Sequence, residues 1–319
     1  MTALETYLEQ RNLHGLDARV ERIYSWLPHF LARVVEKQIT PRHMRAIAPR
    51  TFFHREADKG WALRRGKQEL ARSTPLADLV GRLTRPVSIV ATGPTVRDYP
   101  WEKIRKENRF VIAVNGAPTV LKEVGITPDL LVVVDNRFAR SGARHFENAP
   151  GVPLVTIFRA ASILTTCSPG RLAERRFSLL EKINSWYGLP QIAHAQIAEL
   201  SRTSGTPFHF PEFPDPTYRL GWSEAPELGF FSASTVAFAA LQVAVRLGAT
   251  DIEIIGMDLS GAGRAYDEGP NPRPSSLQEQ YSKTILPSFE IMHQALAGSG
   301  VVIRNLSPVC PLPARLFSP

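Results

Sequence analysis

The sequence predicts an α/β fold: a Rossmann-like, mostly parallel sheet with helices on both faces, plus a helical N-terminal extension. From residue 87 onward, short runs rich in Val, Ile and Leu alternate with segments of helical periodicity. This alternation is typical of parallel sheets that are covered on both sides. Several apolar runs also end abruptly in small polar residues, and ligands of such folds bind at the carboxyl ends of the strands.

The individual elements follow from the spacing of the apolar residues. The expected strands are 87–91, 110–114, 130–134, 154–158, 251–256 and 301–304. The clearest helical patterns are 118–124, 232–247 and 275–297. Together they place the sheet within residues 87–319.

Two regions depart from this pattern. Residues 1–86 have helical spacing interrupted by prolines and show no strand-like alternation, so we expect a basic helical region there. Residues 168–229 are rich in Pro, Ser, His and aromatic residues and show little periodicity. Long irregular insertions in α/β domains are usually functional, so we expect an ordered lid or acceptor-binding subregion.

Length and composition exclude several classes of protein. The chain has 319 residues, and no apolar run approaches the roughly 18–20 residues of a membrane helix. The N-terminus is too charged for a signal peptide, and two cysteines are too few for a disulfide framework, so a reducing cytoplasm is expected. Neither cysteine lies in a Cys/His cluster, so we expect no zinc site.

Positive charge is concentrated at the N-terminus. Residues 1–86 hold 16 Lys and Arg against 9 Asp and Glu, an excess of +7 within the total of +8. Aromatic residues are interleaved with these basic ones, which suits an anionic membrane surface. The alternative is an ordinary basic helical face. Nucleic acid is disfavoured as a partner because no nucleic-acid-binding motif is present.

Polar residues follow four of the predicted strands, where each strand ends. Such residues singly are common turn formers, but four strand ends in register favour a ligand site at one sheet edge. The residues expected in this site are Gly93, Pro94, Thr95, Asn115, Gly116, Asp135, Asn136, Gly256 and Asp258.

A further anion-binding element is expected at Ser232, Ser234 and Thr235, which open the helix 232–247. Hydroxyls there can cap the helix, and its free N–H groups and positive dipole end can bind a phosphate or carboxylate. The chain lacks both the GxxxxGK[ST] loop and the GxGxxG fingerprint. P-loop hydrolysis and hydride transfer are therefore disfavoured.

The loop after the strand 251–256 combines one cation, one phenol and two carboxylates: Arg264, Tyr266, Asp267 and Glu268. These groups could hold a leaving phosphate and a general base together. The alternative is a solvated polar loop. The helix that follows contributes Glu279.

The order of these motifs resembles a known superfamily. Six motifs follow one another along the chain: a GPT turn, an NG pair, GITPD, a helix ending in LGA, the strand IEIIGMDL and NLSP near the C-terminus. This order is similar to that of the bacterial CMP-sialic acid and ulosonic acid glycosyltransferases. The group includes Campylobacter-type lipooligosaccharide sialyltransferases, motility accessory factors and pterin-diphosphokinase-like relatives. The resemblance covers about residues 87–135 and 229–312.

The resemblance implies that residues 87–319 form a GT-A-like nucleotide-sugar-binding catalytic domain. It implies an inverting transfer of an ulosonic acid from a CMP-sugar, with no tightly bound cofactor and no required divalent metal. By the same resemblance the turn residues 93–95 sit against the CMP phosphate and sugar. The remaining implied roles are donor contact by Asn115 and Asn136, carboxylate or phosphate binding by Ser232 and Ser234, lining of the cytidine or ribose by Gly256 and Asp258, and binding of the leaving phosphate by Tyr266.

One departure from the family pattern concerns the general base. The sialyltransferases carry a catalytic histidine after the tyrosine loop, where this chain reads NPRPSSLQEQYSK. The base is therefore expected among Glu279, Asp267, Glu268 and Asp258.

The segment GMDLSGAGRAYDE looks most like proteins of lipopolysaccharide core assembly, which favours 3-deoxy-manno-octulosonic acid (Kdo) over sialic acids. A glycolipid or oligosaccharide acceptor and a peripheral position on the cytoplasmic face of the inner membrane are then expected. Two alternatives stay open. One is an ATP-dependent pterin-type diphosphokinase, which would need clustered magnesium ligands. The other is a non-catalytic, nucleotide-binding and membrane-recruited subunit.

Overall fold

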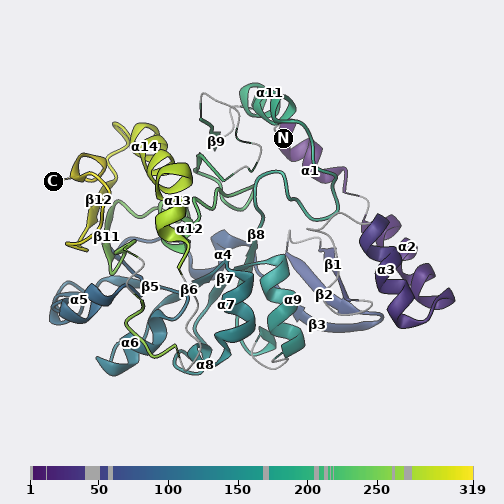
Figure 1. Cartoon of the computed structure of the whole chain (residues 1–319), viewed down its shortest axis with the longest axis horizontal. Helices are drawn as coiled ribbons and strands as arrows, with labels where there is room; N and C mark the ends of the chain where they lie inside the picture. Colours follow the sequence, from purple (N-terminus) through teal and green to yellow (C-terminus); the bar gives the residue numbers. More distant parts are fainter. Residues whose placement is uncertain are drawn as a thin grey trace.

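A seven-stranded parallel sheet forms the centre of the computed structural model (Figure 1). The structure describes residues 3–11, 13–39, 51–56, 60–167, 172–204, 208–211, 215, 217, 219–260, 263–268 and 275–318. The strands lie in the order β12-β11-β4-β5-β6-β7-β8, and every neighbouring pair is parallel. They are β4 (Val87–Val90), β5 (Phe110–Val114), β6 (Leu130–Val133), β7 (Leu154–Ile157), β8 (Phe177–Leu180), β11 (Asp251–Ile255) and β12 (Val302–Asn305). The predicted α/β fold is confirmed.

The strand order reverses beside β4. The chain runs outward from β4 through β5, β6 and β7 to β8, and later returns to place β11 on the other side of β4. At such a switch point the connections from two neighbouring strands leave in opposite directions and open a crevice at their carboxyl ends. The crevice therefore lies above the residues that follow β4 and β11.

Helices cover both faces of the sheet. α12 (Val236–Arg246) packs across β4, β5 and β6, with nearly its whole length buried. Right-handed crossovers place the helices that connect β4 to β8 on the opposite face. These are α5 (Glu102–Lys106), α6 (Ala117–Glu123), α7 (Asn136–Ser141), α8 (Ala143–Phe146) and α9 (Phe158–Cys167), with the short 3-10 helix η2 (Pro94–Asp98) after β4. The strands β4 to β8 and β11 are buried along almost their full length because mostly apolar side chains face both helical layers, whereas the edge strand β12 is only partly buried.

The N-terminal region is only partly helical. The helices α1 (Ala3–Glu9), α2 (Leu13–Trp26) and α3 (His29–Ile39) agree with the prediction, and α4 (Leu76–Val80) leads into the sheet. Three segments that were expected to continue the helices instead form an antiparallel sheet of β1 (Thr51–Arg55), β2 (Trp61–Arg65) and β3 (Gln68–Arg72). The helical expectation is therefore wrong for these segments.

The reason lies in how β1 and β2 are buried. In each, the first three residues are buried and two basic residues follow, His54-Arg55 in β1 and Arg64-Arg65 in β2, so the strand alternation that sequence reading looks for is absent. The hairpin between β2 and β3 turns at Gly66, whose φ of 56° suits glycine in a tight turn. Phe53 and Trp61 pack edge-on against Phe158 and Tyr187, which joins this small sheet to the main core.

Residues 168–229 contain more regular secondary structure than expected where the structure describes them. β8 lies inside this segment and forms the edge of the central sheet, so the expectation of an irregular insertion is wrong for residues 177–180. The segment also contains α11 (His194–Ser204) and a short antiparallel pair, β9 (Phe208–His209) with β10 (Trp222–Ser223). The domain boundaries at 86/87, 168 and 229, and the role as a lid, stay predictions.

The predicted helix 275–297 is interrupted. It consists of α13 (Leu277–Gln280), a π-helical turn (Tyr281–Ile285) and α14 (Leu286–Ala295). Pro287 lacks the N–H that would bond to the carbonyl four residues earlier, so regular α-helical bonding cannot continue through this point. The 3-10 turn η4 (Ala314–Leu316) ends the described chain, and no described helix is long and apolar enough to span a bilayer.

Candidate functional site

A cavity of about 460 Å³ lies at the carboxyl ends of β4, β5, β6 and β11, beside the start of α12. The sequence-predicted residues that line it are Gly93, Pro94, Asn115, Asp135, Ser234, Thr235, Gly256, Asp258 and Tyr266. The structure thus brings together residues from five separate segments of the chain. The predicted residues Thr95, Gly116, Asn136 and Ser232 are next in the chain to, or near, lining residues but are not themselves part of the lining.

The turn after β4 is held by Asp258. The backbone N–H of Thr95 donates to Asp258 Oδ2 at 2.9 Å, and the Thr95 hydroxyl donates to Oδ1. A Cβ on Gly93 would come within 2.5 Å of Asp258 Cγ and 2.6 Å of the Gly256 carbonyl oxygen, so only glycine fits here. Both carboxylate oxygens of Asp258 are therefore engaged in bracing the turn.

Two asparagines leave polar atoms without a partner. The Oδ1 atoms of Asn115 and Asn136 are buried and form no hydrogen bond with the described residues. Asn115 also has a φ of 48°, in the left-handed region that asparagine tolerates better than most residues. An unsatisfied buried polar atom costs about 1–3 kcal/mol, so two of them beside one cavity indicate a ligand that completes their bonding.

The start of α12 faces the same cavity. The helix begins at Val236, four residues later than expected, because Ala233 and Ser234 have φ values of 39° and 57°, outside the helical region. The side chain of Thr235 at the N-cap makes no capping bond. The first N–H groups of the helix have no intrahelical partner, so they and the positive end of the dipole are available to an anion.

Ser234 is held in place from the other side. The Thr284 hydroxyl, on the π-helical turn, donates to Ser234 Oγ at 2.9 Å and lies 3.1 Å from the Gln280 carbonyl oxygen. The irregular helix therefore supports the turn that precedes α12.

Tyr266 is clamped into the cavity wall by its neighbours. The N–H of Ala265 donates to the Thr92 carbonyl at 2.8 Å, the Arg97 guanidinium donates to the Ala265 carbonyl, and Arg144 donates to that of Asp267. Burial raises the pKa of the Tyr266 phenol, so the phenol is a neutral hydrogen-bond donor at neutral pH.

His145 supports the same tyrosine and was missed by sequence reasoning. Its ring lies 4.4 Å from that of Tyr266 and stacks on Phe138 at 5.4 Å, and its Nδ1 is 2.6 Å from the Thr119 hydroxyl oxygen. Burial, with a smaller effect of Arg144, lowers the pKa of His145 to about 4, so the ring is neutral. A Cβ on Gly116 would come within 2.2 Å of the Tyr266 ring, so the tyrosine fits tightly between these groups.

The candidate general bases differ in position. Glu268 lines the cavity and is paired with Arg264, and Asp258 lines it with both carboxylate oxygens engaged by Thr95. Asp135, which was expected in the site but not as a base, also lines the cavity and accepts the Arg137 N–H at 2.8 Å. Asp267 and Glu279 have exposed side chains that do not line the cavity. The lining also includes residues that the sequence did not single out: Arg137, Phe138, Ser141, Leu259, Ser260, Ser275 and Ser276.

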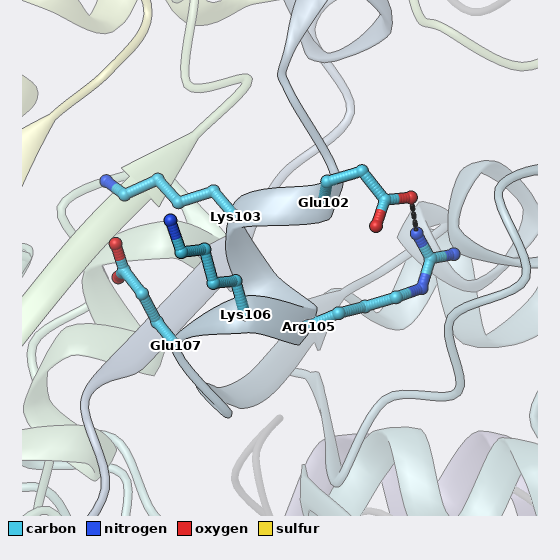
Figure 2. Close-up of a pocket in the computed structure, with 5 residues that line it drawn as sticks. All are labelled: Glu102, Lys103, Arg105, Lys106 and Glu107. Atoms are coloured by element: carbon cyan, nitrogen blue, oxygen red, sulfur yellow. Dashed lines mark hydrogen bonds and ion pairs between the residues drawn. The ribbon is translucent and has the colours of Figure 1, made fainter.

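A second hollow lies beside α5, lined by Glu102, Lys103, Arg105, Lys106 and Glu107 (Figure 2). Glu102 pairs with Arg105 at 2.5 Å, while Lys103 and Glu107 pair with groups further inside the protein. Its charged groups are thus largely satisfied within the protein, unlike the asparagines of the first cavity. No group of three or more metal-ligating side chains occurs among the described residues, and the expectation about metals stays a prediction.

The chain is similar in sequence to known proteins of one description. Residues 217–312 match the family model of the 3-deoxy-D-manno-octulosonic acid transferase WaaZ. The chain is 29% identical over 243 residues to a probable 3-deoxy-manno-octulosonic acid transferase of Escherichia coli K12, covering 71% of this chain and 79% of that protein. It is 27% identical over 241 residues to the protein of the same description from Salmonella typhimurium LT2, covering 69% and 80%.

Among solved structures, the chain is similar to the Campylobacter jejuni sialyltransferase CST-II in complex with a trisaccharide acceptor and CMP. The TM-score is 0.39 and the identity 12%, over 74% of this chain and 88% of that one. The family model and the two curated relatives confirm the predicted resemblance to ulosonic acid glycosyltransferases.

Proposed function

We propose that this chain is a glycosyltransferase that moves an ulosonic acid, Kdo in the first place, from a CMP-activated donor to a glycan acceptor. The observation that carries the proposal is the cavity, which is lined both by Asn115, with its unpartnered side-chain oxygen, and by the open start of α12. A CMP-ulosonate carries both kinds of group that such a cavity recognises: anionic phosphate and carboxylate, and neutral hydroxyl and amino donors.

Each half of the cavity suits one part of the donor. The α12 start and Ser234 suit the phosphate or the sugar carboxylate, because free N–H groups and a positive dipole end favour anions. Asn115 and Asn136 suit hydroxyl or amino groups, because their free oxygens are hydrogen-bond acceptors. We also propose that Gly256 and Asp258 line the cytidine or ribose of the donor.

The preference for Kdo rests on the family model and the relatives. The matched residues 217–312 include the α12 start, Asp258 and the Tyr266 loop, which together form one side of the cavity. Both curated relatives are described as probable transferases of 3-deoxy-manno-octulosonic acid.

The chemistry we propose is an inverting displacement. An acceptor hydroxyl oxygen forms a bond to the anomeric carbon, the bond from that carbon to the CMP phosphate oxygen breaks, and its electron pair leaves on the phosphate. Among the predicted bases Glu268 fits best for the hydroxyl proton, because it lines the cavity two residues from Tyr266. Asp258 is engaged by Thr95, and Asp267 and Glu279 are exposed outside the lining. Tyr266 can donate to the leaving phosphate.

We propose a lipopolysaccharide core or a related glycolipid as the acceptor, and a peripheral position on the cytoplasmic face of the inner membrane. The basic N-terminal region of residues 1–86 supports this, since anionic lipid attracts Lys and Arg near its surface. No metal or tightly bound cofactor is proposed.

A donor-consumption assay tests the proposal. The purified chain is incubated with CMP-Kdo or CMP-sialic acid, with and without a truncated lipopolysaccharide acceptor, and released CMP is measured by chromatography. We expect CMP release from CMP-Kdo that rises when acceptor is added. If CMP is released only from CMP-sialic acid, the donor sugar is a sialic acid instead of Kdo. No release from either donor, together with ATP-dependent transfer of diphosphate to a pterin alcohol, would overturn the proposal.

A further inference from the structure

The helical hairpin formed by α2 and α3 carries a cluster of exposed apolar side chains. Trp26 is 84% exposed, Phe30 76%, Leu31 47% and Val34 42%. Large side chains of this kind are normally buried, and scattered single exceptions need no explanation. Here four of them lie within nine residues, around the turn that connects the two helices.

The opposite face of the same hairpin is already used for packing. Val20, Tyr24 and Ala32 form a small core with Phe52 of β1, separate from the main core, and the Tyr24 hydroxyl bonds to Glu36 Oε2 at 3.0 Å. Figure 1 shows α2 and α3 side by side at one end of the molecule, next to β1. The hairpin is thus fixed to the body through its inner face, and its outer apolar side chains face away.

The charges beside the apolar cluster are positive. Arg19 and Arg22 precede Trp26 by seven and four residues, so the helical repeat places all three near one face of α2. Both arginines are exposed, and neither forms an ion pair with the residues that the structure describes. Among the hairpin side chains whose burial is described, the exposed ones are cationic or uncharged.

We propose that this surface, Arg19, Arg22, Trp26, Phe30, Leu31 and Val34, docks on an anionic lipid bilayer. Aromatic and aliphatic side chains beside arginines match the layered chemistry of a bilayer surface, with acyl chains below and anionic headgroups above. A symmetric dimer through the same face would bring the arginines of two copies together, and no acidic side chain is exposed beside them among the hairpin residues whose burial is described. The lipid surface therefore fits the charges better than a second copy does.

This inference deepens the proposed function, because it names the surface that would bring the enzyme to a membrane-embedded acceptor. It does not depend on the chemistry in the cavity. The hairpin lies in the N-terminal region, whereas the cavity is built from residues 91–277. Lipid binding and CMP binding can therefore be measured separately on the same protein.

The test is co-sedimentation of the full chain with vesicles of phosphatidylcholine alone or with added phosphatidylglycerol, both free of glycan. The variants are Trp26→Ser with Phe30→Ser, and Arg19→Ser with Arg22→Ser. The matched control is Val309→Ser, which removes an apolar side chain that is 53% exposed elsewhere on the surface. Because all these side chains are exposed, each variant should keep the wild-type unfolding temperature and CMP affinity.

We expect wild-type and Val309→Ser proteins to bind the anionic vesicles equally. The apolar double variant should bind these vesicles at least about tenfold more weakly. The arginine variant should lose roughly fivefold in vesicle affinity per arginine, and high salt should remove this difference from the wild type. Absence of vesicle binding by the wild-type chain, or unchanged binding by the apolar variant, would overturn the inference. So would a dimer in solution that the apolar variant makes monomeric. If the wild-type chain does not bind CMP, that result would instead count against the proposed function.

Discussion

Two polar regions of the central sheet are opposite in character: one lies on β4 and β11, and the other lies at the carboxyl ends of β5 and β6. Below the carboxyl edge, Glu253 of β11 accepts hydrogen bonds from Ser88, Tyr99 and Lys103 at 2.7–2.9 Å and lies 3.1 Å from Arg109. At the edge itself, Asn115 and Asn136 keep buried oxygens without partners. We call the first region the Glu253 network and the second the donor cavity.

The difference separates a part that stabilises the protein from a part that we propose binds a ligand. Burial of Glu253 works to raise its pKa, but hydrogen bonds from Lys103 and Tyr99 and the charge of Arg109 lower the pKa overall. The network is thus complete in the folded chain. The donor cavity is incomplete and contains left-handed backbone at Asn115, Ser234 and Leu259, a combination found where a protein holds a site ready at some cost in stability.

The largest expected effect is on catalysis in the donor cavity. Glu268→Gln removes the proposed base while keeping the shape of the side chain, so turnover with CMP-Kdo should fall by about 10²–10⁴ with little change in KM. Glu279→Gln is the control, since that side chain is exposed outside the cavity lining, and it should retain near wild-type turnover. The reverse result in steady-state assays would make Glu279 the base.

The next effect is on stability, in the Glu253 network. Glu253→Ala leaves the buried guanidinium of Arg109 without its fully buried carboxylate partner, so the free energy of unfolding should fall by about 3–5 kcal/mol in urea denaturation. CMP affinity of the folded protein should change less than twofold. Glu107 is also a partner of Arg109, but its side chain is 39% exposed. Glu107→Ala should therefore lower the free energy of unfolding by less than about 1 kcal/mol. A large loss of CMP affinity in Glu253→Ala would remove the distinction between the two regions.

A smaller effect depends on pH and concerns the support of Tyr266. The unfolded chain binds a proton at His145 near its ordinary pKa of 6.5, but the folded chain binds it only near 4. The contribution of neutral His145 to the free energy of unfolding should therefore be complete above pH 6.5. It should fall by about 3 kcal/mol as the pH drops toward 4. Unfolding measured from pH 4 to 8 should show this slope in the wild type and lose it in His145→Gln. Equal slopes in the two proteins would contradict the neutral, buried histidine.

The smallest expected effect is the loss of one ligand contact. Asn115→Gly removes an unpartnered carboxamide while keeping a backbone that accepts the φ of 48°, so CMP affinity should fall about tenfold without loss of stability. Asn108→Gly is the matched control, because Asn108 has the same φ and lies outside the cavity lining. Titration calorimetry measures both, and equal affinities in the two variants would show that Asn115 does not contact CMP.

The sequence was sufficient for the strands around the donor cavity. Apolar runs that end in Thr92-Gly93, Asn115-Gly116 and Gly256-Met257-Asp258 are buried parallel strands, and the polar residues collect at one edge because parallel strands all end there. The short strand β8 was missed because it has only four residues, Phe-Ser-Leu-Leu, and all four are buried, a pattern that periodicity cannot separate from a helix or a buried loop.

His145 could not have been found from the sequence. It lies in the short helix α8, in no motif, and its role arises from contact with a tyrosine 121 residues later in the chain. Nor could the sequence separate Glu268 from Glu279, since both follow the same strand and only the fold directs one into the cavity. Long-range packing, rather than local pattern, decides both cases.

Binding of CMP tests the central claim most directly. Thermal unfolding of the wild-type chain is followed with CMP, with CDP, with ATP and magnesium, and without ligand. A ligand that binds the folded state alone raises its stability by about 2.7 kcal/mol at a hundred times its Kd. We expect CMP to raise the unfolding midpoint of the wild type, with a smaller rise in Asn115→Gly and no rise with ATP and magnesium. No shift with millimolar CMP, or a shift with ATP and magnesium alone, would contradict the assignment of the cavity to a CMP-activated donor.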